Sequence, residues 1–386
     1  MGQHLTDKKI LFIQVTEPAA YPPLINAALV ASDFGWRSTF LSSPNVSSEL
    51  CLPSSEHLTE IKLKPRRRQN VQALDYIKYC WASMKAAWGL KPKIIYVSDP
   101  LGAFPGLVAA FFCHSQIVYH EHDSPKRQSD LHWLFRIARR AILERCDACI
   151  FPNEARALLT ELDLGVPLKR LKVIWNTPRV SELPRATSKH KGSNDAFVLY
   201  YHGSISRDRL PRALIETVVH FKGRLKFWIA GYETESGKGL IEEFQAAINE
   251  GTGTDTFRYL GTIKYREELL IAASQADFGL AIVPARSDDA NLDNMAGASN
   301  KVFDYMAAGV IPLVTDLPEW NSTYVQPGYA IPVNPDSASS LIGAIENLMQ
   351  DTTFRLSLVE KNRAKIVDDW NYETIFGGAM VSILMQ

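Results

Sequence analysis

Two histidines and two carboxylates follow one another at the end of an apolar run. His120, Glu121, His122 and Asp123 come directly after residues 116–119. Residues two apart in an extended strand point to the same face, so His120 and His122 would share one side. Two imidazoles can chelate a metal ion, but a protein metal site needs at least a third ligand, and the sequence offers none.

Arginines follow a glycine at the end of a second apolar run. Gly203 comes after residues 196–201, and Ser204, Arg207 and Arg209 stand within the next six positions. A glycine after a strand lets the backbone approach a ligand, and arginines bind phosphate oxygens. This chemistry suits a diphosphate. The alternative is a surface turn with solvated arginines.

A third stretch, residues 297–320, predicts a loop, a short helix and a strand. Ser299 is the expected N-cap of a helix that opens at Asn300 and ends before Gly309. The N-terminus of this helix offers backbone N–H groups and the positive end of its dipole to an anion. Asp304, one turn inside, is too deep to cap the helix and would accept hydrogen bonds from hydroxyl groups. A nucleotide diphosphate sugar presents both kinds of group, whereas a plain helix–strand unit would leave Asp304 in solvent.

Short apolar runs alternate with helical stretches along the whole chain, which predicts parallel sheets with ligands at the carboxyl ends of their strands. A length of 386 residues suits two domains. The polar stretch 179–194 is the expected linker between a first domain, 1–178, and a second, 195–365. Residues 366–386 are expected to form a final helix. The turn that follows the first predicted strand lacks a Gly-x-Gly pattern in both domains, which argues against a nicotinamide-binding enzyme.

The third stretch resembles the donor-binding signature of retaining family 4 glycosyltransferases, K-x-[FL]-E-Y/A-M-A-A-G-x-P-V-V-x-[ST]-D. The positions that fall on this signature are Lys301, Phe303, Tyr305, Met306, Ala307, Ala308, Gly309, Pro312, Val314, Thr315 and Asp316. The resemblance extends over essentially the whole chain, closely over residues 196–335 and more loosely before residue 178. It implies an α/β protein of the GT-B fold, with two Rossmann-like domains facing across a cleft. It also implies that the C-terminal helix, residues 366–386, crosses back to the first domain.

The resemblance also implies an activity. A hexosyltransferase of this family would move a sugar, with retention, from a UDP- or GDP-sugar to a glycan or lipid-linked acceptor. It would need no metal and no cofactor beyond the nucleotide sugar, which is its substrate. Synthesis of a bacterial surface polysaccharide is the expected setting.

By the same resemblance, His122, or else His120, would lie beside the donor sugar and the acceptor. Arg209 and Asp304 complete the expected catalytic set, with Arg209 on the leaving diphosphate and Asp304 on the ribose hydroxyls. The backbone near Thr262 would read the base. The expected donor-binding residues are Gly203, Ser204, Arg207, Arg209, Gly231, Thr262, Ile263, Ser299, Asn300, Lys301 and Asp304.

Two positions depart from the family pattern. Ser204 stands where an arginine is usual, and Ala296 stands where the first of two glutamates is usual. Two alternatives remain open, and these departures favour the first. One is a catalytically degenerate GT-B module that binds a partner or a glycan. The other is a nucleotide-sugar epimerase, which would turn over with the donor alone.

The composition limits which binding partners and which cellular compartment are expected for this protein. Lysines and arginines number 42, as do aspartates and glutamates, so no bulk binding to nucleic acid is expected. The sequence contains no uninterrupted run of 18 apolar residues, so no membrane-spanning helix is predicted. The basic residues at 62–68 precede a stretch that carries Trp81, Met84 and Trp88 at near-helical spacing. They predict either a core-packed helix after a basic loop or peripheral contact of a cytoplasmic protein with the inner face of a membrane.

Five cysteines, an odd number, lie within the first 149 residues and do not resemble a disulfide framework. Cys146 and Cys149 form a C-x-x-C pattern. No further metal ligands stand nearby in the sequence. The pattern therefore predicts two buried thiols rather than a redox pair or half of a zinc site.

Overall fold

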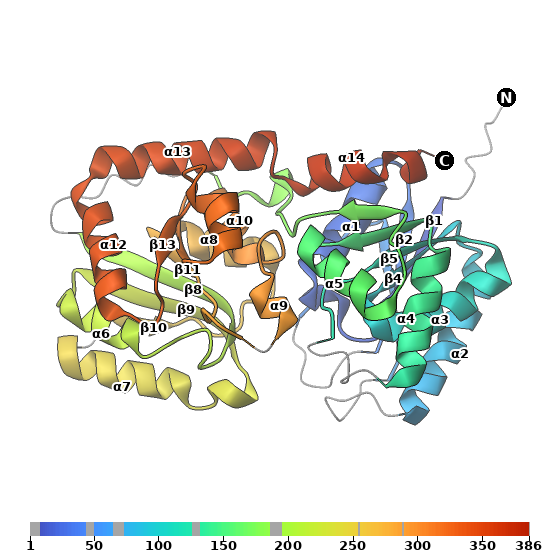
Figure 1. Ribbon diagram of the computed structural model, residues 1–386, viewed down its shortest axis with the longest axis horizontal. Helices are drawn as coiled ribbons and strands as arrows, with labels where there is room; N and C mark the ends of the chain where they lie inside the picture. The colour runs from blue at the N-terminus through green and yellow to red at the C-terminus, as the bar shows by residue number, and fades with distance from the viewer. Residues whose placement is uncertain are drawn as a thin grey trace. The chain divides into compact units, whose positions relative to one another are not determined.

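The computed structural model describes residues 8–43, 50–64, 73–125, 132–185, 195–253, 255–287 and 289–385. The chain divides into two compact units. The first contains Met1–Asn176, Asp288–Ala298 and Tyr372–Gln386, and the second contains Thr177–Ser287 and Ser299–Asn371. Each unit is built on one parallel sheet with helices on both faces (Figure 1), which confirms the predicted α/β class.

The first sheet has the strand order β3-β2-β1-β4-β5-β6-β7. Its strands are β1 (Lys9–Ile13), β2 (Arg37–Ser42), β3 (Leu58–Lys62), β4 (Ile94–Ser98), β5 (Gln116–His120), β6 (Ala148–Phe151) and β7 (Leu171–Val173). One face packs against α2 (Ala73–Leu90), α3 (Asp99–Cys113), α4 (Trp133–Arg145) and α5 (Glu154–Leu164). The other face packs against α1 (Pro22–Asp33) and α14 (Tyr372–Leu384). Both faces are buried, as the continuous apolar strand sequences require.

The second sheet has the strand order β10-β9-β8-β11-β12-β13. Its strands are β8 (Phe197–Ile205), β9 (Leu225–Glu233), β10 (Phe257–Tyr259), β11 (Phe278–Ala281), β12 (Ile311–Thr315) and β13 (Ile331–Val333). Helices α6 (Ala213–His220), α7 (Leu240–Thr252) and α12 (Ala338–Gln350) build one large apolar core with the sheet. The remaining helices of this unit are α8 (Arg266–Ser274), α10 (Asn300–Ala307), α11 (Pro318–Trp320) and α13 (Thr352–Asp368).

The unit boundaries depart from the expected linker and second domain. Val180–Glu182 forms a 3-10 turn that belongs to the second unit, and residues 186–194 lie outside the described residues. Residues 288–298, with the short helix α9 (Ala290–Asp293), belong to the first unit, although the sequence on both sides belongs to the second. Side chains of the first unit hold this segment: Asn153 donates to the carbonyl of Ala296, and Asn176 donates to that of Ala298. Local sequence patterns do not reveal such long-range contacts.

Strand β8 is longer than predicted. The expected turn at residues 202–205 is part of the strand, and Gly203 pairs with Gly231 of β9. Both glycines have positive φ angles, +117° and +144°. A Cβ atom on Gly231 would lie 1.9 Å from the carbonyl oxygen of Gly203. Glycine at this pair therefore lets the two strand ends approach closely, and the ladder continues past the predicted turn.

The predictions for the cysteines, for the tryptophans of α2 and for membrane spans can also be compared with the structure. Cys146 and Cys149 are free and buried, as predicted. Trp81 and Trp88 on α2 are exposed, so the expected core packing of these side chains is wrong. Of the basic loop that precedes α2, residues 65–72 lie outside the described residues. No helix in the described parts of the chain is long and apolar enough to cross a membrane.

Candidate functional site

The two histidines meet at the carboxyl end of β5, in the first unit. The ring centroids of His120 and His122 are 3.7 Å apart, which confirms that the two side chains share a face. The Tyr96 hydroxyl lies 2.7 Å from His120 Nδ1. His120 Nε2 and both ring nitrogens of His122 are buried and have no hydrogen-bond partner among the described residues. Buried polar atoms of this kind are rare in proteins, which makes the pair a candidate ligand site.

Glu121 points to the opposite face and does not join the histidines. Its carboxylate forms an ion pair with Arg139 and accepts a hydrogen bond from the Tyr119 hydroxyl at 2.7 Å. Among the described residues, no group of three histidine, cysteine or carboxylate side chains lies close enough to hold a metal ion. Glu121 therefore has a structural role, and of the H-E-H sequence only the two imidazoles face the candidate ligand site.

Asp99 and Arg156 fix the backbone of His122. The N–H of His122 donates to Asp99 Oδ1 at 2.8 Å, and its carbonyl accepts from Arg156 Nη1 at 2.7 Å. Asp99 has φ +61°, at the sharp turn from β4 into α3. Arg156 also donates to the carbonyls of Asn291 and Asn294, and so ties the end of β5 to the 289–298 segment. Sequence reasoning missed Arg156, because an arginine early in a helix gives no sign that it will be buried.

Burial sets the charge of the histidines. Burial, with a smaller contribution from Arg156, lowers the pKa of His122 to about 3. Burial and His122 hold the pKa of His120 well below its ordinary value. Both rings are therefore neutral near pH 7. A neutral imidazole offers one donor and one acceptor, the pair of functions that a sugar hydroxyl can satisfy.

Cations gather at the carboxyl end of β8, in the second unit. Lys301 Nζ lies 5.4 Å from the centroid of the Tyr201 ring and 3.2 Å from the position of a Cβ atom on Gly203. The Tyr201 hydroxyl donates to the carbonyl of Ser204 at 2.6 Å and is also hydrogen-bonded to Arg209. No carboxylate in the described part of the chain lies within ion-pair distance of Lys301 or Arg209. These two cations therefore remain available to an anion.

The charge of Lys301 is poised near neutral pH. Burial and the neighbouring charge of Arg209 lower the pKa of Lys301 to about 7, against a smaller opposing effect of Asp304. A diphosphate in this place would favour the protonated amine. The strand end thus gains positive charge when an anion arrives.

The role expected for Asp304 needs correction. Its side chain is fully buried, with Oδ1 accepting from Arg266 Nη2 at 2.5 Å and Oδ2 lying 3.2 Å from His202 Nε2. Burial acts to raise the pKa of Asp304, but Arg266 and His202 outweigh it and the pKa falls below its ordinary value. The carboxylate is charged and covered, so it holds α10 in place instead of reaching ribose hydroxyls. Arg266, which also pairs with Glu182 at 3.1 Å, was missed because it lies 38 residues from Asp304 in the sequence.

The N-terminus of α10 opens where it was predicted. Ser299 occupies the N-cap position, but its side chain makes no capping hydrogen bond. Asn300 Oδ1 is buried and unpartnered within the described residues. The first N–H groups of α10, which no helical carbonyl can satisfy, are thus not covered by the side chain of Ser299. They lie in the same helix turn as Lys301.

The other predicted donor-binding residues divide into two groups. Gly231 donates from its N–H to the carbonyl of Gly261 at 2.9 Å, and Thr262 Oγ1 donates to the carbonyl of Gly231 at 3.3 Å. Together with the adjoining Ile263, they lie beside the Gly203 strand end. Arg207 does not join them, because its guanidinium pairs with Glu243 at 2.8 Å and remains half exposed.

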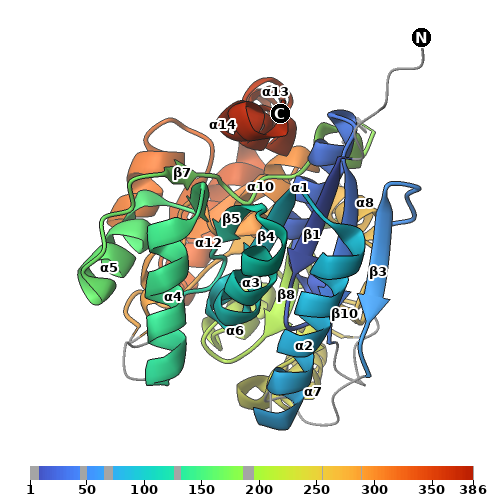
Figure 2. The same ribbon diagram turned by 90° about the vertical axis from the view of Figure 1, so that its right-hand side faces the viewer.

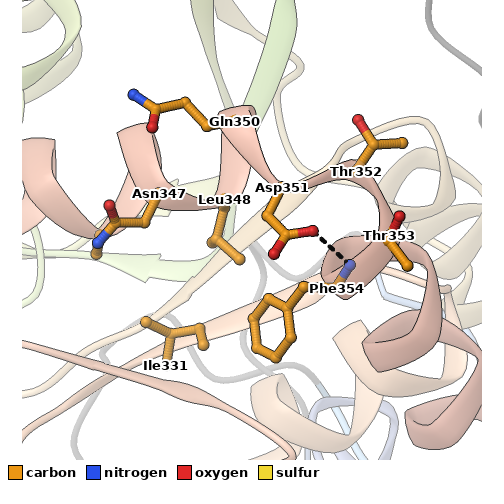
Figure 3. Close-up of a pocket in the computed structure, with 9 residues that line it drawn as sticks. Ile331, Asn347, Leu348, Gln350, Asp351, Thr352, Thr353 and Phe354 are labelled. Atoms are coloured by element: carbon orange, nitrogen blue, oxygen red, sulfur yellow. Dashed lines mark hydrogen bonds between the residues drawn. The ribbon is translucent and has the colours of Figure 1, made fainter.

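A separate hollow of about 770 Å³ lies between α12, the start of α13 and β13 (Figure 3). Asp351 caps α13 there by accepting a hydrogen bond from the N–H of Phe354 at 2.8 Å. The lining holds amides, hydroxyls and one carboxylate but no cation, and it includes none of the predicted site residues. This chemistry does not suit a diphosphate.

Known proteins support the resemblance seen in the sequence. Residues 33–177 match the model of Glycosyltransferase Family 4, while no curated protein matches the chain. Sucrose-phosphate synthase from Thermosynechococcus elongatus is 15% identical, with 97% of each chain covered and a TM-score of 0.68. Anabaena HepE, solved with UDP and glucose, is 14% identical, with 97% of this chain and 100% of HepE covered and a TM-score of 0.70. A glycosyltransferase from Rickettsia africae is 10% identical, with 98% of each chain covered and a TM-score of 0.70.

These structural likenesses concern the fold, because the sequence identities are low. They extend over nearly the full length of both chains and therefore include both units. The chain thus has the GT-B fold of glycosyltransferases, and its residues 33–177 match the model of Glycosyltransferase Family 4.

Proposed function

We propose that this protein is a retaining hexosyltransferase that moves a sugar from a nucleotide diphosphate sugar to a hydroxyl group of a glycan or lipid-linked acceptor. One observation carries the proposal. Lys301 lies beside Gly203 in the first turn of α10, and Arg209 is hydrogen-bonded to Tyr201 next to it; neither cation has a carboxylate partner among the described residues. Two cations and a helix N-terminus that the Ser299 side chain does not cap form a binding site for a diphosphate. HepE, which has the same fold, was solved with UDP.

The proposed reaction needs no nucleophile from the protein. The acceptor oxygen forms a bond to the anomeric carbon on the face from which the nucleotide leaves, and the bond from that carbon to the phosphate oxygen breaks. The electron pair of the broken bond goes to the diphosphate, and the hydroxyl proton goes to the leaving phosphate oxygen. Lys301, Arg209 and the first N–H groups of α10 stabilise the charge that develops on the diphosphate.

His122 has a positioning role in this proposal. Its neutral ring can donate one hydrogen bond to a sugar or acceptor oxygen and accept another from a hydroxyl group. Burying both ring nitrogens without a partner costs on the order of 1–3 kcal/mol for each unsatisfied group. A bound hydroxyl would remove this cost, which supports a ligand at this place.

The cellular setting forms a further part of the proposal. We place the enzyme in the cytoplasm, at the inner face of a membrane, in the synthesis of a bacterial surface polysaccharide, with no metal requirement. The five cysteines are free, and free cysteines are usual in proteins of a reducing compartment. The phosphate-binding chemistry comes from side chains and backbone N–H groups, which supports catalysis without a metal ion.

The test is donor turnover. The full chain is incubated with UDP- and GDP-sugars in the presence of a chelator, and nucleotide release and the anomer of the released sugar are followed by NMR. Slow hydrolysis of one donor, with the released sugar first appearing in the anomeric form of the donor, is expected. An inverted first product would contradict retention, and conversion of the donor to an epimer without nucleotide release would show an epimerase instead.

A second candidate, a degenerate GT-B module, is favoured by one observation. Ala296, which stands where the family has its first glutamate, is buried and cannot contact a donor sugar through a carboxylate. Tight binding of a nucleotide sugar with neither release nor transfer would favour this candidate.

A further inference from the structure

Three neighbouring helices of the first unit, α2, α3 and α4, leave large apolar side chains exposed to solvent. On α2, Ser83 and Ala87 are fully buried, whereas Trp81 and Trp88 are 63% and 67% exposed. Packing explains the buried positions, because small residues let the helix approach the sheet. It does not explain two tryptophans in water, which a core-packed helix would turn inward.

Helices α3 and α4 repeat the pattern. Gly106 of α3 lies so close to the sheet that a Cβ atom would come within 2.3 Å of the Val97 side chain, while Phe111 is 78% exposed. On α4, Ile142 and Leu143 are buried together with Ala138, yet Trp133 is 61% exposed. Exposed aromatic rings on three successive helices point to a use for the outer side.

The exposed side chains belong to one layer. Helix α3 packs against both α2 and α4, and the three helices lie side by side (Figure 2). Monomeric soluble proteins rarely expose apolar patches larger than a few hundred Å², and larger ones mark interaction sites. We call this surface the outer aromatic face, and its main residues are Ile77, Trp81, Trp88, Phe104, Phe111 and Trp133.

The outer aromatic face is also basic. The stretch from residue 73 to residue 93 contains four lysines and one aspartate, in a chain whose formal net charge is zero. Lys78 and Lys85 are exposed on α2 at helical spacing from Trp81 and Trp88, so they share its outer side. The exposed carboxylates Asp75 and Glu144 pair with Lys78 and Arg140, at 3.8 Å and 3.0 Å. The charges of Lys78, Lys85 and Asp75 on α2 therefore sum to a net positive charge beside Trp81 and Trp88.

We propose that the outer aromatic face docks on the surface of an anionic lipid bilayer. Tryptophan and phenylalanine rings favour the boundary between headgroups and acyl chains, and lysines above them meet anionic headgroups. A second copy of the chain fits less well, because a symmetric contact would bring two basic faces together. Membrane contact is part of the proposed function, and we assign it to this face. Only the purpose of the contact, which would bring the enzyme to a lipid-linked acceptor, rests on the proposed function.

The experiment is flotation of the full chain with vesicles. One set contains phosphatidylglycerol in phosphatidylcholine, and the other contains phosphatidylcholine alone. The protein is expected to float with the anionic vesicles at low salt and to be released in roughly 1 M salt, where the screening length is about 3 Å. Stabilisation by nucleotides, measured on the same samples, reports on the donor site and does not depend on lipid.

Variants assign the binding to this face. Trp81→Ser and Trp88→Ser are each expected to weaken binding to anionic vesicles about tenfold, because each removes an apolar anchor. Lys78→Ser and Lys85→Ser are each expected to weaken it about fivefold. Phe354→Ser, which removes an exposed aromatic ring from the second unit, is the matched control and should bind as the wild type does. Unchanged thermal midpoints show that the variants are folded.

Three results would overturn the inference: no flotation with anionic vesicles at low salt, equal binding to the two vesicle types, and equal loss with the Phe354→Ser control. Self-association of the chain that the Trp81→Ser variant abolishes would also overturn it, since the face would then be an interface between copies. None of these results bears on nucleotide binding, so the proposed function and the membrane contact can fail separately.

Discussion

The strand ends of the two units carry opposite chemistry. In the first unit, the end of β5 presents two buried neutral imidazoles with unpartnered nitrogens. In the second, the end of β8 presents Lys301 and Arg209 beside a glycine backbone. The same kind of parallel sheet thus carries a site suited to neutral hydroxyl groups in one unit and a site suited to a diphosphate in the other.

Burial is the main cause of the pKa shift at both ends, but the consequences differ. It lowers the pKa of His122 to about 3, so the charge of this ring does not change between roughly pH 5 and pH 9. It lowers the pKa of Lys301 to about 7, so the charge of this amine changes within the physiological range. We therefore expect the first site to be insensitive to pH and the second to respond to it.

The largest expected effect is a loss of unfolding free energy when Asp304, which holds α10 in place, is removed. Asp304→Ala leaves Arg266 buried with Glu182 as its remaining carboxylate partner, and losing one partner of a buried ion pair typically costs about 3–5 kcal/mol of unfolding free energy. Urea unfolding at pH 7 measures the loss. Glu243→Ala, which breaks the exposed pair with Arg207, is the control and should cost less than about 1 kcal/mol. Similar losses in the two variants would show that Asp304 does not support α10.

His122→Ala should separate the two sites. Losing one well-placed hydrogen-bonding group in an active site lowers turnover about 100- to 1000-fold. Nucleotide affinity should stay within about twofold of wild type, because no cation at the β8 end is changed. Donor turnover and calorimetric titration measure the two quantities, with His122→Asn as a variant that keeps a polar side chain. A nucleotide affinity that falls together with turnover would contradict the separation.

The pH dependence of nucleotide binding should follow Lys301. Its protonated form, which binds the diphosphate, predominates below about pH 7 and disappears as the pH rises through the pKa. Affinity for the nucleotide should therefore fall about tenfold between roughly pH 6.5 and pH 8.5. Lys301→Arg, which stays charged over this range, should flatten the profile. A wild-type affinity that rises over this range would show that the amine does not bind the phosphates.

The smallest effect sharpens the boundary of the cationic site. Arg207→Ala should change nucleotide affinity by less than about threefold, because Arg207 is half exposed and already paired with Glu243. Arg209→Ala should weaken binding about tenfold or more, the usual value of a charge-assisted hydrogen bond. A larger loss in Arg207→Ala than in Arg209→Ala, measured by titration, would exchange the roles assigned to these arginines.

Sequence patterns could predict much of this structure. The alternation of apolar runs and helices predicted two parallel-sheet units, and the stretch from Lys301 to Asp316 predicted α10 and β12 almost to the residue. The shared face of His120 and His122 followed from strand periodicity. These features are local, so spacing along the chain was sufficient to find them.

The partners of the site residues could not be predicted in this way. Arg266 and Asp304 are 38 residues apart, and Arg156 contacts a segment about 138 residues further along the chain. Such contacts depend on how the elements pack, which periodicity does not describe. Asp304 was assigned to ribose for this reason, since its position in the helix suggested an acceptor and nothing local indicated that Arg266 and His202 would cover it.

The central claim is that the β8 end binds the diphosphate of a nucleotide. The most direct test is a thermal-shift titration of the wild type, Arg209→Ala and His122→Ala with UDP, GDP, ADP and CMP. A nucleotide at 100 times its dissociation constant stabilises a protein by about 2.7 kcal/mol, which such a titration detects readily. We expect one nucleoside diphosphate to stabilise the wild type and His122→Ala equally, and Arg209→Ala much less. No shift with any nucleotide, or equal shifts in all three proteins, would contradict it.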